Sequence, residues 1–209
     1  MMRIESIAAQ PDRVGRHKVT FSDGRIMRLY RQTAEDFCLY TGMELDEEQM
    51  QSLSLAVDKM SAKMRAVRIL SQTNVSKDDL QQRLIRKGED PACAKEAVSW
   101  MSDLNLLDDS KTAEQIVLKC IHKGYGKSRA KQALFEKRIP KEYWEAALRD
   151  YPDQTEKIVD FLRAKISNPA DERQMRRIMD ALVRKGHSYS EIRSAMEQIS
   201  LDIDEFPEG

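Results

Sequence analysis

The stretch "IMDALVRKG" at residues 178–186 has two counterparts earlier in the chain, and the three together predict the fold. The counterparts are "LQQRLIRKG" at residues 80–88 and "AKQALFEKRIP" at residues 130–140. In register, Leu84, Leu134 and Leu182 align at steps of 50 and 48 residues, and a lysine stands three positions after each leucine. A repeat of this period is typical of tandem helical modules.

Each copy has the pattern of two amphipathic helices with the lysine near their junction. Apolar residues recur four positions apart on both sides of the lysine, and such positions share one face of a helix. A glycine follows the lysine in the first and third copies and favours a helix stop. The second copy reads Arg138-Ile139-Pro140 instead, and Pro140 is expected to be the first residue of the next helix. A third helix is expected before each pair, near residues 61–71, 110–122 and 153–165.

The first sixty residues have a different pattern. Two β-branched or aromatic runs flank Ser22-Asp23-Gly24 within residues 18–30, which is a strong β-hairpin signal. Residues 2–10 alternate loosely and are expected to add an edge strand. A helix is expected from Thr33 until Gly42 stops it, and another is expected to start near Asp46 and to run into the first repeat.

The predicted fold is therefore mainly α, with three tandem three-helix repeats in an elongated array and a small N-terminal β-hairpin or sheet extension. The expected segments are an N-terminal β-rich and helical extension (1–58), repeat 1 (59–107), repeat 2 (108–151), repeat 3 (152–200) and an acidic tail (201–209).

The composition agrees with an exposed helical protein. The chain has 209 residues, of which 33% are charged and only 6% aromatic. No apolar run approaches the ~18 residues of a membrane-spanning helix. Cys38, Cys93 and Cys120 lie in helical patterns and are expected to be small buried residues of a protein in the reducing cytoplasm.

The net charge of zero conceals strong local imbalances. Residues 32–58 carry a charge of −7, whereas residues 119–141 carry +7. The basic stretch is a candidate surface for phosphates or an acidic protein, and the acidic stretch could fold back and mask it. A solvated helix face is the ordinary alternative for such a charge run. The candidate binding residues are Lys119, Lys123, Tyr125, Lys127, Arg129, Lys131, Lys137, Arg138 and Lys141, with a secondary basic cluster at Arg173, Arg176, Arg177, Arg184 and Lys185.

Catalytic signatures are lacking in the sequence. His17, His122 and His187 lie far apart in polar or turn contexts, and the cysteines form no CxxC pair. Glycine loops for nucleotides and nucleophile elbows are missing too. The acidic pair Asp108-Asp109 is explained as the start of a helix. We therefore expect no enzyme activity, no cofactor and no metal.

The ordered combination of motifs in the first two repeats resembles the RecX family, the regulators of the RecA recombinase. The resemblance rests on residues 80–88, on "LNLLDDSKTAEQIV" at 104–117 and above all on "HKGYGKSRAKQALFEKRIP" at 122–140. It is strong over residues 64–148 and weaker to about residue 200. The family's Lys-Gly-Ile step is altered, because Arg138 replaces the glycine.

The resemblance implies a regulator that lodges in the groove of a RecA–DNA filament, and we expect the chain to be a cytoplasmic monomer. Such proteins inhibit the RecA ATPase, strand exchange and coprotease activities in recombination, DNA repair and the SOS response. The RecA nucleoprotein filament is thus the expected partner, and any direct binding to DNA is expected to be weak. Two alternatives remain open at this level: an autonomous helical DNA-binding module and a helical-repeat scaffold for another protein.

Overall fold

The structure is a computed structural model that describes residues 1–167 and 171–205, with side chains described as far as residue 199. It divides into two compact units, Met1–Leu107 and Asp108–Gly209. A small antiparallel sheet opens the first unit, and the rest of the described chain is mainly helical. The predicted fold class, mainly α with an N-terminal sheet, is confirmed.

The sheet of the first unit has the strand order β3-β2-β1-β4. Its strands are β1 (Met2–Ile7), β2 (Arg16–Phe21), β3 (Ile26–Tyr30) and β4 (Glu44–Leu45). The hairpin around Asp23-Gly24 is confirmed as the β2–β3 pair, and Gly24 adopts φ +82° in its turn. The first strand is not an edge strand as predicted, because β4 pairs with its outer side. β4 is too short to give a signal in the sequence.

The helix expected from Thr33 to Gly42 is shorter than predicted. Helix α1 spans Arg31–Asp36, and the chain reverses at Cys38, which has φ +50°. Gly42, at φ +96°, belongs to the turn that leads into β4. Cys38 is exposed, contrary to prediction, whereas Cys93 and Cys120 are buried as predicted.

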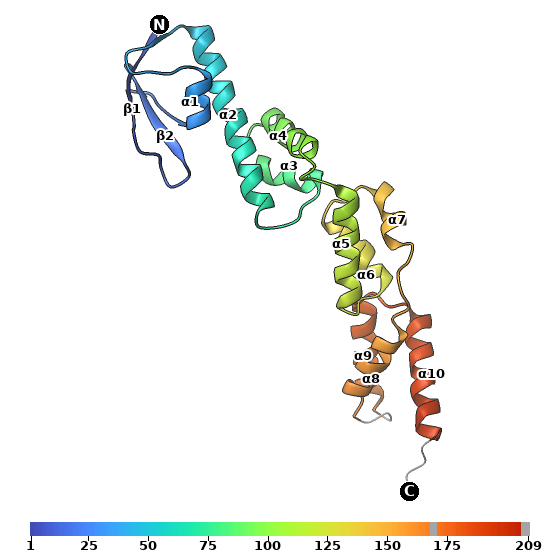
Figure 1. Ribbon diagram of the computed structural model, residues 1–209. Helices are drawn as coiled ribbons and strands as arrows, with labels where there is room; N and C mark the ends of the chain where they lie inside the picture. The colour runs from blue at the N-terminus through green and yellow to red at the C-terminus, as the bar shows by residue number, and fades with distance from the viewer. Residues whose placement is uncertain (168–170, 206–209) are drawn as a thin grey trace. The chain divides into compact units, whose positions relative to one another are not determined.

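Helix α2 (Glu47–Leu70) joins the sheet to the first helical group. Asp46 caps its first turn in a reciprocal capping box with Gln49, which explains the abrupt start of this helix. Leu53 packs in the core of the sheet, while Ala62 and Ala66 pack with α3 (Lys77–Arg86) and α4 (Pro91–Asp103). Figure 1 shows this single helix running from the sheet to α3 and α4 without a break at residue 58. The predicted run of this helix into the first repeat is confirmed.

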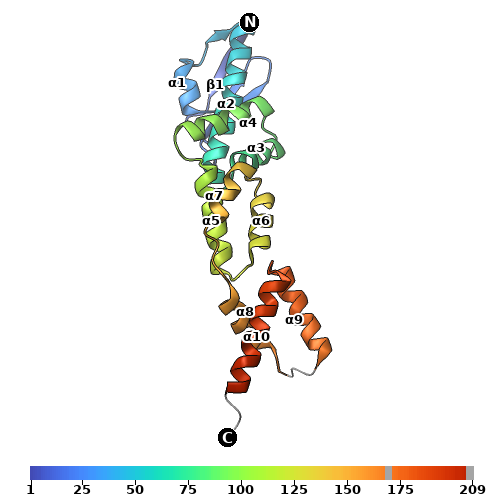
Figure 2. The same ribbon diagram turned by 90° about the vertical axis from the view of Figure 1, so that its right-hand side faces the viewer.

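The second unit contains two groups of helices, each around its own core. The first comprises α5 (Asp109–His122), α6 (Lys127–Glu136), the 3-10 turn η1 (Lys141–Tyr143) and α7 (Trp144–Leu148). The second comprises α8 (Thr155–Lys165), α9 (Glu172–Arg184) and α10 (Tyr189–Glu205), seen together in Figure 2. Helix α10 continues through residue 205, so the expected acidic tail starts as helix, and its residues 206–209 lie outside the described part.

The three aligned segments adopt one local conformation. Leu84, Leu134 and Leu182 are each at most 1% exposed, and each lies in the core of its own helical group. The lysine three positions later is the C-terminal cap of α3, α6 and α9 in turn. The next residue has a positive φ in all three, including Arg138 at +54°. Pro140 precedes η1 as its N-cap, one position earlier than predicted. The segment boundaries set out from the sequence stay predictions.

Candidate partner-binding surface

The basic stretch of the second unit folds as a helical hairpin. Ala130 and Leu134 are buried in the core shared with α5, whereas Lys127 and Lys131, which flank this buried stripe, are exposed on α6. Lys119 and Lys123 lie at the end of α5 that leads into the same turn, and both are exposed. The structure thus brings four of the predicted lysines to the turn end of the hairpin.

The remaining candidates on this hairpin lie at its other end. Lys137, Arg138 and Lys141 follow the last turn of α6, about 15 Å along the helix axis from Lys127. The nine predicted residues therefore do not form one cluster. They form two basic groups separated by the length of α6.

Between α6 and α7 lies a groove of about 380 Å³ with a positive lining. We call this the α6–α7 groove, and it is lined by Lys127, Lys131, Trp144, Glu145, Leu148 and Arg149. Three cations face one carboxylate there. Helix α6 has no acidic residue in its first turn, so its macrodipole adds positive potential at the same end. The groove is therefore suited to phosphate or carboxylate groups.

Two residues of this region were not predicted from the sequence to take part in binding. Arg149 lies beyond the window in which the charges are unbalanced, and only α7 brings it back toward α6. Phe135 is 70% exposed on α6, one turn after Lys131. The exposure of Phe135 could have been predicted from the helical period, because the buried stripe of α6 passes through Ala130 and Leu134 and leaves Phe135 outside it. An exposed phenylalanine beside lysines provides an apolar contact for a partner.

Arg129 has a structural role that the charge count did not reveal. Its Nη1 atom donates to Glu136 Oε1 at 2.9 Å, and its side chain is half-buried. This hydrogen bond holds the pKa of Glu136 below its usual value, so the pair is ionised and neutral overall at physiological pH. Arg129 also packs against Gly186 of the next helical group. It is therefore less available to a partner than the neighbouring lysines.

The turn between α5 and α6 is a junction and not an exposed loop. Gly126 is buried, and its N–H donates to the carbonyl of Lys185 at 3.0 Å. A Cβ on Gly126 would lie 2.0 Å from the Gly186 oxygen. Tyr125 is half-buried, and its carbonyl accepts from the Tyr151 hydroxyl at 2.6 Å. Close backbone contact between two turns thus requires glycine at both positions.

Two side chains from the group of α8, α9 and α10 satisfy carbonyls at the end of α5. Lys157 Nζ donates to the Ile121 carbonyl at 2.5 Å. His187 Nε2 lies 3.0 Å from the Gly124 carbonyl, and a carbonyl only accepts, so Nε2 carries the proton. Burial lowers the pKa of His187 below its usual value. The sequence had placed His187 in a polar turn, whereas it is 5% exposed.

The secondary basic cluster lies mostly on one helix. Arg173, Arg176 and Arg177 line a shallow surface of α9 together with Glu172 and Asp180, so its net charge is small. Arg184 is exposed on the same helix. Lys185 instead sits over the ring of Phe161, with Nζ 4.0 Å from the ring centre, and stabilises the fold by a cation–π contact.

Reactive groups are not gathered in the part of the chain that the structure describes. No cluster of three or more His, Cys, Asp or Glu residues with metal-binding geometry occurs among the described residues. Burial raises the pKa of the thiols of Cys93 and Cys120, so both are protonated at neutral pH and poor nucleophiles. No helix in the described ranges is long and apolar enough to cross a membrane.

Comparisons with known proteins identify relatives of this fold. No protein-family model matches the chain. The regulatory protein RecX of Xanthomonas axonopodis pv. citri is 30% identical over 134 residues, which are 63% of this chain and 83% of that protein. The regulatory protein RecX of Vibrio campbellii is 27% identical over 150 residues, 68% of this chain and 94% of that protein.

Two crystal structures share the fold. One is of a regulatory protein RecX, with a TM-score of 0.65 and 23% identity, and the match covers 94% of this chain and all of that one. The other is of RecX from Lactobacillus salivarius, with a TM-score of 0.61 and 24% identity over 70% of this chain and 99% of that one.

Proposed function

The chain belongs to the family of RecX regulatory proteins, and from this premise we propose that it binds the RecA–DNA filament and inhibits RecA. The inhibition covers ATP hydrolysis, strand exchange and the coprotease activity. The protein acts as a monomer in the cytoplasm and needs no cofactor. The observation that carries the proposal is the relation to RecX proteins over most of the chain, together with the α6–α7 groove, which offers a surface for an anionic partner.

The α6–α7 groove is the main contact in this proposal. Lys127, Lys131 and Arg149 meet phosphates of the DNA or carboxylates of RecA, and Phe135 adds an apolar contact beside them. Lys119 and Lys123 extend the positive surface around the turn. Because these contacts are solvent-exposed ion pairs, binding weakens as salt rises.

The other basic groups are secondary contacts. Lys137, Arg138 and Lys141 lie at the far end of the helical hairpin, and the exposed arginines of α9 lie in the next helical group. Groups spaced along successive helical modules can contact successive protomers of a filament. Their removal therefore weakens binding less than removal of the groove cations.

RecA ATPase activity on single-stranded DNA, with the chain titrated in, tests the proposal. Inhibition at less than one chain per RecA protomer is the expected result, because a regulator lodged in a filament affects several protomers. An unchanged ATPase rate at a severalfold excess of a folded chain would contradict it.

The same titration separates the two alternatives. An autonomous DNA-binding module would leave RecA unaffected when DNA is in excess and would bind naked DNA in a salt-sensitive way. A scaffold for another protein would do neither. The α6–α7 groove favours the DNA-binding module over the scaffold, because a phosphate backbone satisfies the same three cations.

A further inference from the structure

The sheet of the first unit has one covered face and one open face. Val19 of β2 and Leu29 of β3 are buried, and they share a core with Leu53 of α2. Successive residues of a strand point to opposite faces, so the next residues along, Lys18 and Arg28, project from the other side. Both are exposed. We call this open side the outer face of the sheet.

Two cations lie directly opposite each other on the outer face. Lys18 and Arg28 are partners in the β2–β3 register. The carbonyl of Lys18 accepts from the N–H of Ala8 at 2.8 Å, on the side of β1, so the pair with Arg28 is of the non-hydrogen-bonded kind, in which side chains approach most closely. Like charges in such a pair destabilise a sheet. Neither residue makes an ion pair with a carboxylate among the described residues, so the repulsion would be relieved by an anionic ligand.

The neighbouring rows of the outer face do not neutralise this pair. On one side lie Thr20 and Ile26, which carry no charge, and on the other lie Arg16 and Tyr30. The charge of Arg16 is balanced by Asp12, because its Nε and Nη2 atoms both donate to Asp12 Oδ2, at 3.0 and 2.8 Å. The excess positive charge of these rows is therefore that of the lysine and arginine pair.

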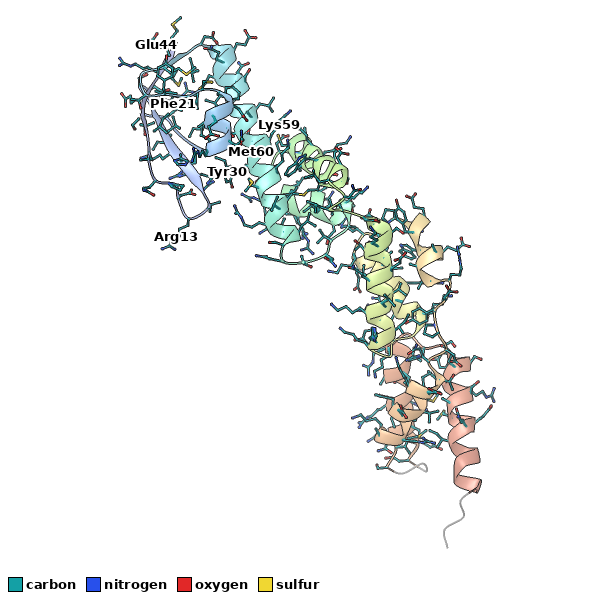
Figure 3. The ribbon with its side chains drawn as sticks, viewed as in Figure 1. Arg13, Phe21, Tyr30, Glu44, Lys59 and Met60 are labelled. Carbon is teal, nitrogen blue, oxygen red and sulfur yellow. The ribbon has the colours of Figure 1, made fainter. Side chains whose placement is uncertain are left out.

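The carboxylates of the strands lie away from the pair. Figure 3 shows Glu44 at the end of the sheet where the chain begins and Arg13 at the opposite end. Glu44 is opposite Arg3 across the β1–β4 pair, so these two charges balance. Glu5 lies at the bulge of β1, and β2 and β3 contain no acidic residue. Positive charge is thus concentrated on β2 and β3, toward the end at which Arg13 lies.

One more cation lies at that end. Arg68 of α2 is exposed, and its Nη2 atom donates to the Tyr30 hydroxyl at 3.2 Å. Since Tyr30 is opposite Arg16 in the row next to Lys18, this bond places a guanidinium close to the pair. Helix α2 therefore extends the positive surface of the sheet.

The side chains of the outer face are of the kinds that contact phosphate groups. Besides the cations, it presents the hydroxyls of Ser6 and Thr20, which are opposite each other on β1 and β2. Lysine, arginine, serine and threonine side chains make most contacts to phosphate oxygens in protein–DNA complexes. A protein partner is held mainly by clustered aromatic or aliphatic anchors. Ile26, 51% exposed, is the one large aliphatic side chain in these rows, so the chemistry favours nucleic acid.

The shape of the face favours a single strand over a duplex. Four strands at intervals of ~4.8 Å span ~14 Å between the outermost strand axes. The major groove of DNA is about 12 Å wide and admits one helix or a two-stranded ribbon. A single strand can instead lie across an open sheet, which is a common way for sheets to bind single-stranded nucleic acid.

We propose that the outer face of the sheet binds the backbone of single-stranded DNA. Lys18 and Arg28 contact neighbouring phosphates, the hydroxyl of Thr20 donates to the backbone beside them, and Arg13 and Arg68 continue the positive surface. Because the contacts are with phosphates, binding does not depend on base sequence. This site lies on the first unit, is separate from the α6–α7 groove and does not depend on the proposed RecA regulation.

The experiment measures binding of the full chain to a fluorescently labelled oligothymidine, without RecA, at several salt concentrations. Lys18→Gln with Arg28→Gln should weaken binding about tenfold. It should also reduce the slope of log Kd against log salt by about 1.4, because two phosphate contacts are lost. The matched control is Arg86→Gln with Lys95→Gln, which removes two exposed cations elsewhere on the first unit and should leave the slope unchanged.

Two further measurements separate this site from the α6–α7 groove and from unfolding. In a chain with Lys127→Glu and Lys131→Glu, the glutamine pair should weaken binding by the same factor. The Tm of the Lys18→Gln, Arg28→Gln variant should be no lower than that of the wild type, because the like-charge pair is removed. An unchanged salt slope, an equal loss in the control, a lowered Tm, or binding to phosphatidylglycerol vesicles but not to oligothymidine would each overturn the proposal.

Discussion

Single residues show why the three aligned segments fold alike. The residue after each capping lysine has a positive φ, which glycine adopts without strain. The second segment has Arg138 there at φ +54°, so it keeps the conformation at a cost in strain. The family motif is therefore altered in residue type but not in backbone conformation. This could not be predicted from the sequence, because glycine is the residue that normally adopts a positive φ.

Arg138→Gly should stabilise the chain by about 1 kcal/mol, because it relieves the left-handed strain. In a domain of this size that corresponds to a rise in Tm of about 2–4 °C. Arg138→Ala removes the same charge but keeps the strain, so its Tm should not rise. A thermal melt of the three proteins checks this, and equal Tm values for the Gly and Ala variants would refute it.

His187 makes the stability of the second unit sensitive to acid. Its Nδ1 is buried without a hydrogen-bond partner in the described structure, and burial lowers its pKa. The folded state therefore binds the proton more weakly than the unfolded state, whose histidine pKa is about 6.5. The contribution of neutral His187 is present above that pH and is lost as the pH falls below it.

Urea unfolding between about pH 7.5 and pH 5 tests the role of His187. The free energy of unfolding should fall toward acid pH more steeply in the wild-type chain than in His187→Gln, which cannot titrate. Parallel slopes in the two proteins would show that other groups carry the acid sensitivity.

At the scale of elements, turn chemistry was read correctly where the interactions are local. The Asp23-Gly24 hairpin, the start of α2 at Asp46 and the stop after Lys87 all follow from neighbouring residues. Tyr125 was named from the sequence as a candidate binding residue, but the turn from Gly124 to Gly126 that carries it packs against the turn at Gly186. Because that contact joins residues about sixty positions apart, no local sequence pattern predicts it.

Gly186→Ala should therefore cost more stability than Gly88→Ala. Both glycines have φ +89°, so both variants suffer about 1–2 kcal/mol of backbone strain. A Cβ at Gly88 meets nothing within 4 Å, whereas at Gly186 it would lie 2.3 Å from the Arg129 nitrogen. Overpacking adds about 1–3 kcal/mol at Gly186 alone. Equal losses of unfolding free energy in the two variants would contradict this, because they would show that the backbone near Gly186 shifts to accommodate the added Cβ at little cost.

At the scale of the whole molecule, the repeats, the composition and the hairpin signal at Asp23-Gly24 were enough to predict a mainly helical chain with a small sheet. They could not locate the α6–α7 groove, because Arg149 joins Lys127 and Lys131 only through the packing of α7 on the hairpin. The charge count also overstated Arg129, whose partner Glu136 lies within the same basic stretch. Linear charge patterns show how many cations a segment has, but only packing shows which of them face a partner.

The most direct measurement is the concentration of chain that half-inhibits RecA ATPase, compared between two charge-reversal variants. Lys127→Glu with Lys131→Glu reverses two cations of the α6–α7 groove, and Arg86→Glu with Lys95→Glu reverses two exposed cations of the first unit. Arg129 is left unchanged, because its replacement would also break its ion pair with Glu136. The account predicts that the groove variant needs at least about tenfold more chain, a loss of ~1.4 kcal/mol, while the control inhibits like the wild type. Undiminished inhibition by a folded groove variant would contradict it.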